Sequence, residues 1–75
     1  MKQNKKIKLT KREIEVKKLL LVGFTNAKIA SKLYITQSTA KRHISSIYRK
    51  EGVNTRFELF VKNFKDIITG MNKNQ

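Results

Sequence analysis

The sequence predicts an all-α domain of four helices built around a helix-turn-helix. Four segments each follow a threonine suited to cap a helix, and apolar residues recur in them at helical spacing. No stretch alternates apolar and polar residues as a half-buried strand would. The chain has 75 residues, no proline and no cysteine, which gives room for one domain and excludes disulfides and thiolate chemistry.

The first two helices are predicted from their ends. Thr10-Lys11-Arg12-Glu13 has the pattern of a capping box, in which the threonine hydroxyl and the glutamate carboxylate each accept a free backbone amide. The helix that follows is expected to stop at Gly23 in a left-handed conformation. A short second helix begins at Thr25, and its apolar positions are Ile29, Ala30 and Leu33.

The third helix is predicted to begin at Thr36, after a tight turn at Tyr34-Ile35, and to end at Gly52. Two short helices joined by a tight turn form the helix-turn-helix pattern. The inward stripe of the third helix consists of Ala40, Ile44 and Ile47. The opposite face contains no acidic residue and presents Ser38, Arg42, Ser45 and Arg49, flanked by Lys41 and Ser46.

A fourth helix is predicted to begin at Thr55, where Glu58 completes a second Thr-x-x-Glu pattern, and to close at Gly70. Its large apolar residues are Leu59, Phe60, Phe64, Ile67 and Ile68. The predicted organisation is a basic flexible arm at 1–8, the helix-turn-helix domain at 9–70, and a frayed tail at 71–75. The lysines of the arm could solubilise the chain or add sequence-independent contacts to phosphates.

The charge balance indicates a polyanionic partner. Eighteen Lys and Arg residues against five Asp and Glu residues give a net charge of +13 and a pI near 10.5. Charge of this size repels itself and is typical of nucleic-acid-binding domains, although it does not separate DNA from RNA or anionic lipid. No apolar run approaches the ~18 residues of a membrane span, and the basic start lacks the apolar stretch of a secretion signal. We therefore expect a cytoplasmic protein with no membrane partner.

The outward face of the third helix favours double-stranded DNA. Arg42, Arg49 and Lys41 are long enough to reach base edges and phosphates from a helix in the major groove, and small serines between them permit close approach. The alternative is that these cations only solvate an exposed helix.

Enzyme, metal and cofactor chemistry are not indicated. His43 is the only histidine, and one imidazole without cysteine cannot build a zinc site. It lies beside the inward stripe, where a packed histidine is expected more often than a pH switch. The carboxylates are scattered and form no acid–base pair, and the three glycines are isolated helix stops rather than a phosphate-binding loop. We expect no enzyme activity, no metal, no cofactor and no small-molecule ligand.

Several blocks of the sequence resemble the LuxR/GerE/NarL helix-turn-helix family. The similarity covers roughly Leu9 to Val61 and retains the spacing between separate blocks. The blocks are Leu9–Val16, Gly23–Asn26, Ile29-Ala30, Leu33–Thr36, Thr39–Ile44 and Gly52–Arg56. The domain begins within ten residues of Met1, so the chain resembles the stand-alone GerE form, without a phosphoacceptor or ligand-binding domain ahead of it.

The resemblance implies a role for each face of the domain. Residues 37–50 would form the recognition helix, with base contacts from Lys41, Arg42 and Ser45. Contacts to the DNA backbone would come from Lys28, Thr36, Ser38, Thr39 and Arg49. Family members pair through the last helix, which here implies a homodimer interface of Phe60, Phe64, Ile67 and Ile68. The alternative for these four residues is that they close the core of the monomer.

Four positions depart from the family pattern. Lys17 and Glu51 stand where an apolar residue is usual, Ala40 where valine is usual, and Lys28 where glutamate is usual. Lys17 can pair with Glu13 one turn back, and its stem can cover apolar surface. Glu51 must turn outward or pair, and the end of the third helix is expected to fray there.

Two other functions compete with a transcription regulator. The domain could be a module that binds RNA polymerase or another regulator, because promoter-reading domains of sigma factors share the helix-turn-helix. It could also be a basic binder of RNA or membrane surfaces, but its apolar stripes are interrupted and match an internal core. The sequence favours a sequence-specific DNA-binding transcription regulator.

Overall fold

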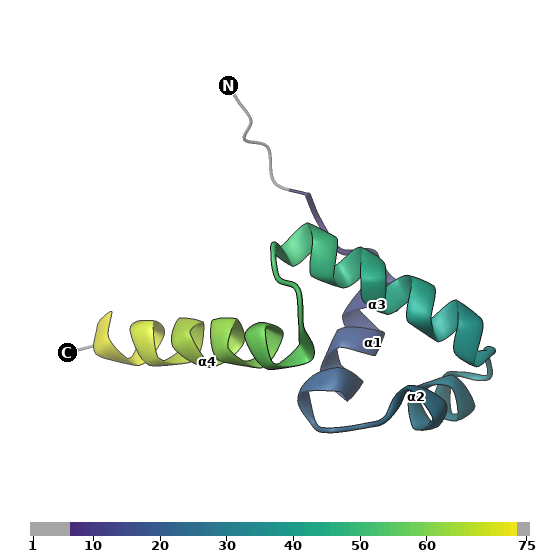
Figure 1. Cartoon of the computed structure of the whole chain (residues 1–75). Coiled ribbons are helices and arrows are strands. Elements are labelled where there is room, and N and C mark those ends of the chain that lie inside the picture. The colour runs from purple at the N-terminus through teal and green to yellow at the C-terminus, as the bar shows by residue number, and fades with distance from the viewer. Residues whose placement is uncertain (1–6, 74–75) are drawn as a thin grey trace.

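Four helices make up the computed structural model, which describes the backbone of residues 7–73 and the side chains of residues 7–65 and 68. They are α1 (Lys11–Leu21), α2 (Asn26–Leu33), α3 (Gln37–Glu51) and α4 (Arg56–Lys73). The first three gather into one body, while α4 extends away from it (Figure 1). No strand occurs between residues 7 and 73, so the predicted all-α class is confirmed. Most of the predicted arm at 1–8 lies outside the described residues.

All four helices begin at the predicted threonines. Thr10 forms the full capping box, because its Oγ1 accepts the Glu13 amide at 3.1 Å and the Glu13 carboxylate accepts the Thr10 amide at 2.9 Å. Thr25 and Thr36 each cap their helix through the hydroxyl. Thr55 accepts the Glu58 amide at 3.0 Å, but the Glu58 carboxylate accepts the amide of Asn54 at 2.7 Å. The second predicted capping box is therefore wrong in one of its two hydrogen bonds. The Glu58 carboxylate accepts the amide of Asn54, the residue before the cap, and not the amide of Thr55.

Two of the three predicted glycine stops are confirmed. Gly23 and Gly52 have φ angles of 99° and 74°, the left-handed conformation that ends a helix. Gly70 does not end α4, which continues to Lys73, so this predicted stop is wrong and positions 71–73 of the predicted tail are helical. A glycine lowers helix propensity by about 1 kcal/mol, but it ends a helix only where the backbone turns left-handed.

The core lies where α1, α2 and α3 meet the start of α4. It consists of Val16, Leu20, Ile29, Ala30, Ala40, Ile44, Ile47 and Leu59. The inward stripe of α3 is confirmed, since its three predicted members are all in this set. Leu59 is fully buried and anchors the start of α4 in this core. Among the residues that the structure describes, no helix combines the length and apolar character that a membrane crossing requires.

Candidate nucleic-acid interface

The outer face of α3 is polar, basic and open to solvent. Lys41, Arg42 and Ser45 are exposed, while Ala40 and Ile47 on the opposite side are completely buried. The buried side fixes the helix, because a packed stripe cannot rotate without exposing apolar surface. Arg49 and Ser38 lie on the same exposed side. The structure thus brings the predicted base-reading residues onto one solvent-facing surface.

The start of α3 presents free backbone amides beside hydroxyl groups. The Thr36 hydroxyl accepts the Thr39 amide at 3.0 Å and donates to the Thr39 hydroxyl at 3.0 Å. Both hydrogen bonds of the Thr36 hydroxyl are thus used in capping the helix. The Thr39 hydroxyl accepts that bond and keeps its own proton to donate. Ser38 is exposed in the first turn, which contains no acidic residue. Helix N-termini attract phosphate groups through free amides and the helix dipole, so this end of α3 suits an anion.

The described carboxylates all lie away from this surface. Glu15 pairs with Arg12 on α1 at 3.1 Å, and Glu58 accepts a backbone amide ahead of α4. Glu13 and Glu51 are engaged at junctions between helices. The outer face of α3 is therefore left with positive charge alone, as binding to a duplex requires.

Glu13 joins the start of α1 to the end of α3. Its side chain is almost fully buried and accepts bonds from Lys50 at 2.8 Å, from the Ser46 hydroxyl at 2.6 Å and from the Thr10 amide. Burial acts to raise the pKa of Glu13, but these hydrogen bonds outweigh it and lower the pKa from 4.5 to about 2. Ser46, expected to flank the outward face, instead turns toward α1.

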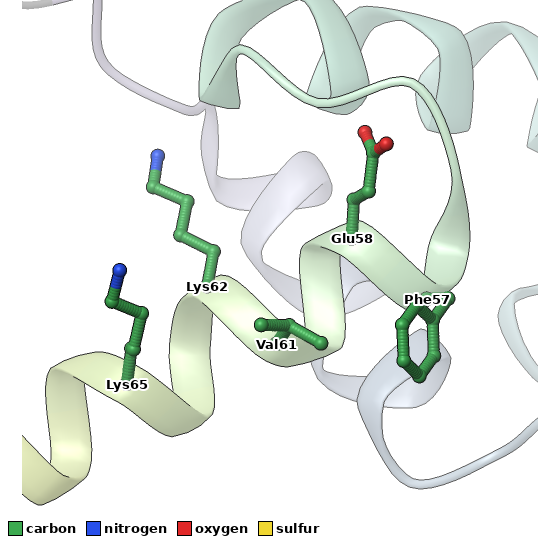
Figure 2. Close-up of a pocket in the computed structure, with 5 residues that line it drawn as sticks. All are labelled: Phe57, Glu58, Val61, Lys62 and Lys65. Carbon is green, nitrogen blue, oxygen red and sulfur yellow. The ribbon is translucent and has the colours of Figure 1, made fainter.

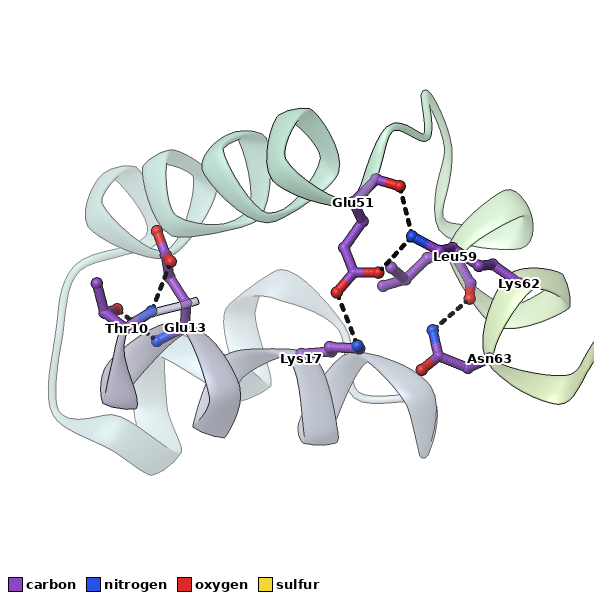
Figure 3. Close-up of polar contacts among 7 residues, drawn as sticks. All are labelled: Thr10, Glu13, Lys17, Glu51, Leu59, Lys62 and Asn63. Atoms are coloured by element: carbon purple, nitrogen blue, oxygen red, sulfur yellow. Dashed lines mark hydrogen bonds and ion pairs between the residues drawn. The ribbon is translucent and has the colours of Figure 1, made fainter. Parts of the chain in front are cut away.

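Glu51 joins α1, α3 and α4. Its carboxylate accepts Lys17 at 2.8 Å and Lys62 at 3.0 Å, as Figure 3 shows. The predicted pair between Lys17 and Glu13 is wrong, because Glu13 is already engaged by Lys50 and Ser46. The two departures from the family pattern, Lys17 and Glu51, thus complement each other. The end of α3 does not fray, since the helix reaches Glu51 and closes at Gly52.

One side of α4 exposes large apolar residues. The rings of Phe60 and Phe64 stack with centroids 6.2 Å apart, and each residue is about half exposed, at 49% and 52%. Ile68, one turn further, is 39% exposed. The Ile67 side chain lies outside the described residues. These phenylalanines therefore do not fill the core of the monomer, which α4 enters through Leu59.

Comparison with known proteins identifies the family. The model of "Bacterial regulatory proteins, luxR family" matches residues 8–62. The spore germination protein GerE of Bacillus subtilis is 44% identical over 54 residues, which cover 72% of this chain and 73% of GerE. The chain belongs to the luxR family. Its members are DNA-binding transcription regulators and not enzymes, and the resemblance found in the sequence is confirmed.

Two longer relatives show how far the similarity extends. The transcriptional regulatory protein DegU of Brevibacillus brevis is 41% identical over 58 residues, or 77% of this chain. The transcriptional regulatory protein LnrK of Bacillus subtilis is 49% identical over 55 residues, or 73% of this chain. In both cases the luxR-family chain spans 25% of the relative's length. What these proteins share with it is therefore the helix-turn-helix domain.

One structural residue of the luxR-family domain was missed by sequence reasoning. The Arg56 guanidinium donates to the Leu20 carbonyl at 2.9 and 3.2 Å and to the Phe24 carbonyl. It thereby binds the last turn of α1 at Leu20 and the connection to α2 at Phe24. No local pattern reveals this role, because donor and acceptors are more than thirty positions apart in sequence.

His43 is half-buried beside Ile44 in α3, where a packed histidine was expected. Among the described residues, no three His, Cys, Asp or Glu side chains gather closely enough to hold a metal ion. The structure thus gives His43 a place at the edge of the helix packing.

Proposed function

We propose that this luxR-family chain binds double-stranded DNA sequence-specifically, with α3 in the major groove, and regulates transcription in the cytoplasm. The observation that carries the proposal is the acid-free outer face of α3, held in place by its buried stripe. The Arg42 guanidinium can donate two hydrogen bonds to the O6 and N7 acceptors of guanine. Lys41, one position before it, and Ser45, three positions after it, are exposed on the same side of α3. A rigid helix with this donor set can distinguish base pairs by their edges.

Contacts to the DNA backbone would fix the register of α3 in the groove. At the start of α3, the Thr39 hydroxyl and the exposed Ser38 hydroxyl would donate to phosphates of one DNA strand. Thr36 caps the helix and so orients both residues. Arg49 is exposed near the other end of α3, and Lys28 is exposed on α2. The basic arm at 1–8 adds phosphate contacts that do not depend on sequence.

We further propose that two copies pair through α4. The exposed stripe of Phe60, Phe64 and Ile68 is apolar surface that a second copy would cover, and Ile67 belongs to the same interface. A symmetric pair would present two recognition helices to half-sites about 10 base pairs apart. GerE, which is 44% identical to this chain, has a similar domain over 73% of its length.

The first test is selection of binding sites from random duplexes, followed by substitution of Arg42. The change Arg42→Ala should cost about 1–3 kcal/mol of binding free energy and relax the preference at one base position. The matched control is Arg12→Ala, which removes an arginine that pairs with Glu15 on α1. An equal loss on all duplexes would make Arg42 a phosphate contact, and equal binding to random and enriched duplexes would overturn the proposal.

The salt dependence of binding separates backbone contacts from base contacts. The logarithm of the binding constant should fall with the logarithm of salt concentration by about 0.9 per phosphate neutralised. Lys28→Ala should weaken all duplexes alike and reduce that slope by about 1. Should the chain capture RNA polymerase without DNA and prefer no duplex, the polymerase-binding module would be the better assignment.

A further inference from the structure

Helix α4 is attached to the rest of the domain by one narrow face near its start. Arg56 donates to the Leu20 carbonyl in the last turn of α1, Leu59 is buried in the core, and Lys62 bonds to the end of α3. These residues are three positions apart and therefore lie on one side of the helix. The apolar stripe with Phe64 and Ile68 lies beyond them, and both residues are exposed.

Lys62 is the attachment farthest along α4 in the described part of the chain. Its amino group donates to the Glu51 carbonyl at 2.7 Å and to the Glu51 carboxylate at 3.0 Å. Lys62 lies about 9 Å along the axis from Arg56, at about 1.5 Å per residue. Contacts at two separate points along α4, at Arg56 and at Lys62, fix the tilt of the helix. A single buried leucine cannot do this.

The position of Glu51 is unfavourable for a negative charge unless the lysines of the neighbouring helices stabilise it. It is the last residue of α3, where the helix dipole disfavours negative charge. Its side chain is 15% exposed, and its carboxylate accepts bonds from Lys17 of α1 and Lys62 of α4. Burial acts to raise the pKa of Glu51, but the bonds from these two lysines lower it below its ordinary value. Glu51 therefore stays charged and connects the recognition helix to both neighbouring helices.

We propose that the Lys17–Glu51–Lys62 bridge sets the angle between α3 and α4 and thereby the half-site spacing that the dimer accepts. The inference rests on the proposed pairing through α4. A tilt of about 10° about Leu59 would move Ile68, about 13 Å further along the helix, by roughly 2 Å. Two-fold symmetry doubles the displacement between the recognition helices, to more than the roughly 3.4 Å rise of one base pair. Lys62 is thus a positioning residue for specificity.

The chain contains a matched control for Lys62. Lys65 projects from the same side of α4, as Figure 2 shows, and makes no ion pair among the described residues. Lys62→Met and Lys65→Met therefore remove the same charge and differ only in the bridge. Lys62→Arg keeps a cation that can reach Glu51. All three variants of the full chain would be measured on duplexes carrying one enriched half-site, or two at centre-to-centre separations of about 8–12 base pairs.

The expected result is a loss of spacing preference in one variant alone. Lys62→Met should reduce the ratio of affinities between the best and worst separations by about fivefold, while Lys65→Met and Lys62→Arg keep the wild-type ratio. Affinity for a single half-site should agree within about twofold between the two methionine variants, because α3 is unchanged.

Three outcomes would overturn the proposal and are distinguishable. Equal spacing preference in both methionine variants would show that the bridge does not position α4. Loss of single half-site binding in Lys62→Met alone would show that Lys62 acts through stability of the whole domain. Absence of any spacing preference in the wild type would remove the proposed pairing itself, and the bridge proposal with it.

Discussion

At the scale of single residues, two of the described carboxylates connect the helices and lie away from the cations on the outer face of α3. Glu13 connects the start of α1 to Lys50 on α3, and Glu51 connects the end of α3 to Lys17 and Lys62. Both carboxylates are mostly buried, so each needs these bonds to remain charged. The basic surface and the packing of the domain therefore depend on the same small set of acids.

Glu13 should make the stability of the fold depend on acid pH. Its pKa in the folded chain is lowered from 4.5 to about 2, so the folded state favours the carboxylate. The resulting stabilisation is fully present above pH 4.5 and is lost as the pH falls from 4.5 toward 2. Thermal unfolding followed by circular dichroism should show the melting temperature falling through this window, and Glu13→Gln should flatten the fall.

The control for Glu13 is Glu15→Gln, which alters an exposed carboxylate paired with Arg12 on the same helix. That change should leave the shape of the pH profile intact, because exposed pairs contribute little. A smaller acid-dependent loss will remain in Glu13→Gln, since the pKa of Glu51 is also lowered. If Glu13→Gln and the wild type lost stability in parallel, the buried network would have no part in acid unfolding.

At the scale of helices, the starts were predictable and the long-range polar contacts were not. A threonine cap bonds to an amide three residues ahead, so the four-residue pattern contains both partners. The bonds from Lys17 to Glu51 and from Lys50 to Glu13 join residues 34 and 37 positions apart, which no local pattern encodes. The outer face of α3 was predictable for the same reason as the caps, because helical spacing alone determines it.

Helix ends were less predictable than helix starts, as Gly52 and Gly70 illustrate. Both are glycines near the expected end of a helix, but only Gly52 turns left-handed. Its neighbour Glu51 is held by two lysines from other helices, which the local sequence does not contain. Whether a glycine ends a helix therefore depends on packing that sequence patterns record only indirectly.

Gly52→Ala should destabilise the domain through backbone strain alone. The φ angle at Gly52 is 74°, and apart from its neighbours in the chain no heavy atom lies within 4 Å of an added Cβ, so the substitution creates no clash with packed residues. The left-handed conformation should cost alanine about 1 kcal/mol, which lowers the melting temperature by roughly 4–8 °C in a domain of this size. Gly52→Asn should lose less, because asparagine tolerates this conformation better. An unchanged melting temperature in Gly52→Ala would contradict the strain argument.

At the scale of the molecule, the body formed by α1, α2 and α3 continues into α4, which extends away from it (Figure 1). The principal extents are 42, 31 and 20 Å, and α4 accounts for the elongation (Figure 1). The three-helix body presents the basic face of α3, and α4 presents the apolar stripe with Phe60 and Phe64. The proposed DNA-binding surface and the proposed pairing surface are therefore separate, so a substitution in one need not disturb the other.

Charge and apolar surface should give pairing and DNA binding opposite responses to salt. A net charge of +13 on each copy opposes pairing in dilute salt, and screening relieves that repulsion. Binding to DNA weakens over the same range, because releasing counterions into a more concentrated salt solution gains less free energy. Sedimentation equilibrium without DNA should therefore show more dimer as salt rises, while titrations with duplex show weaker binding.

Phe64→Glu should separate the two processes. Phe64 is 52% exposed in the monomer, so a carboxylate there remains hydrated and leaves the core intact, but it would be buried between two copies. We expect dimer formation to be lost at high salt and paired half-sites to lose about tenfold in affinity, as 1.4 kcal/mol would give. Ile14→Glu makes the same charge change at an exposed apolar position on α1 and should preserve both. Equal effects of the two substitutions would mean that added negative charge, and not the α4 stripe, governs pairing.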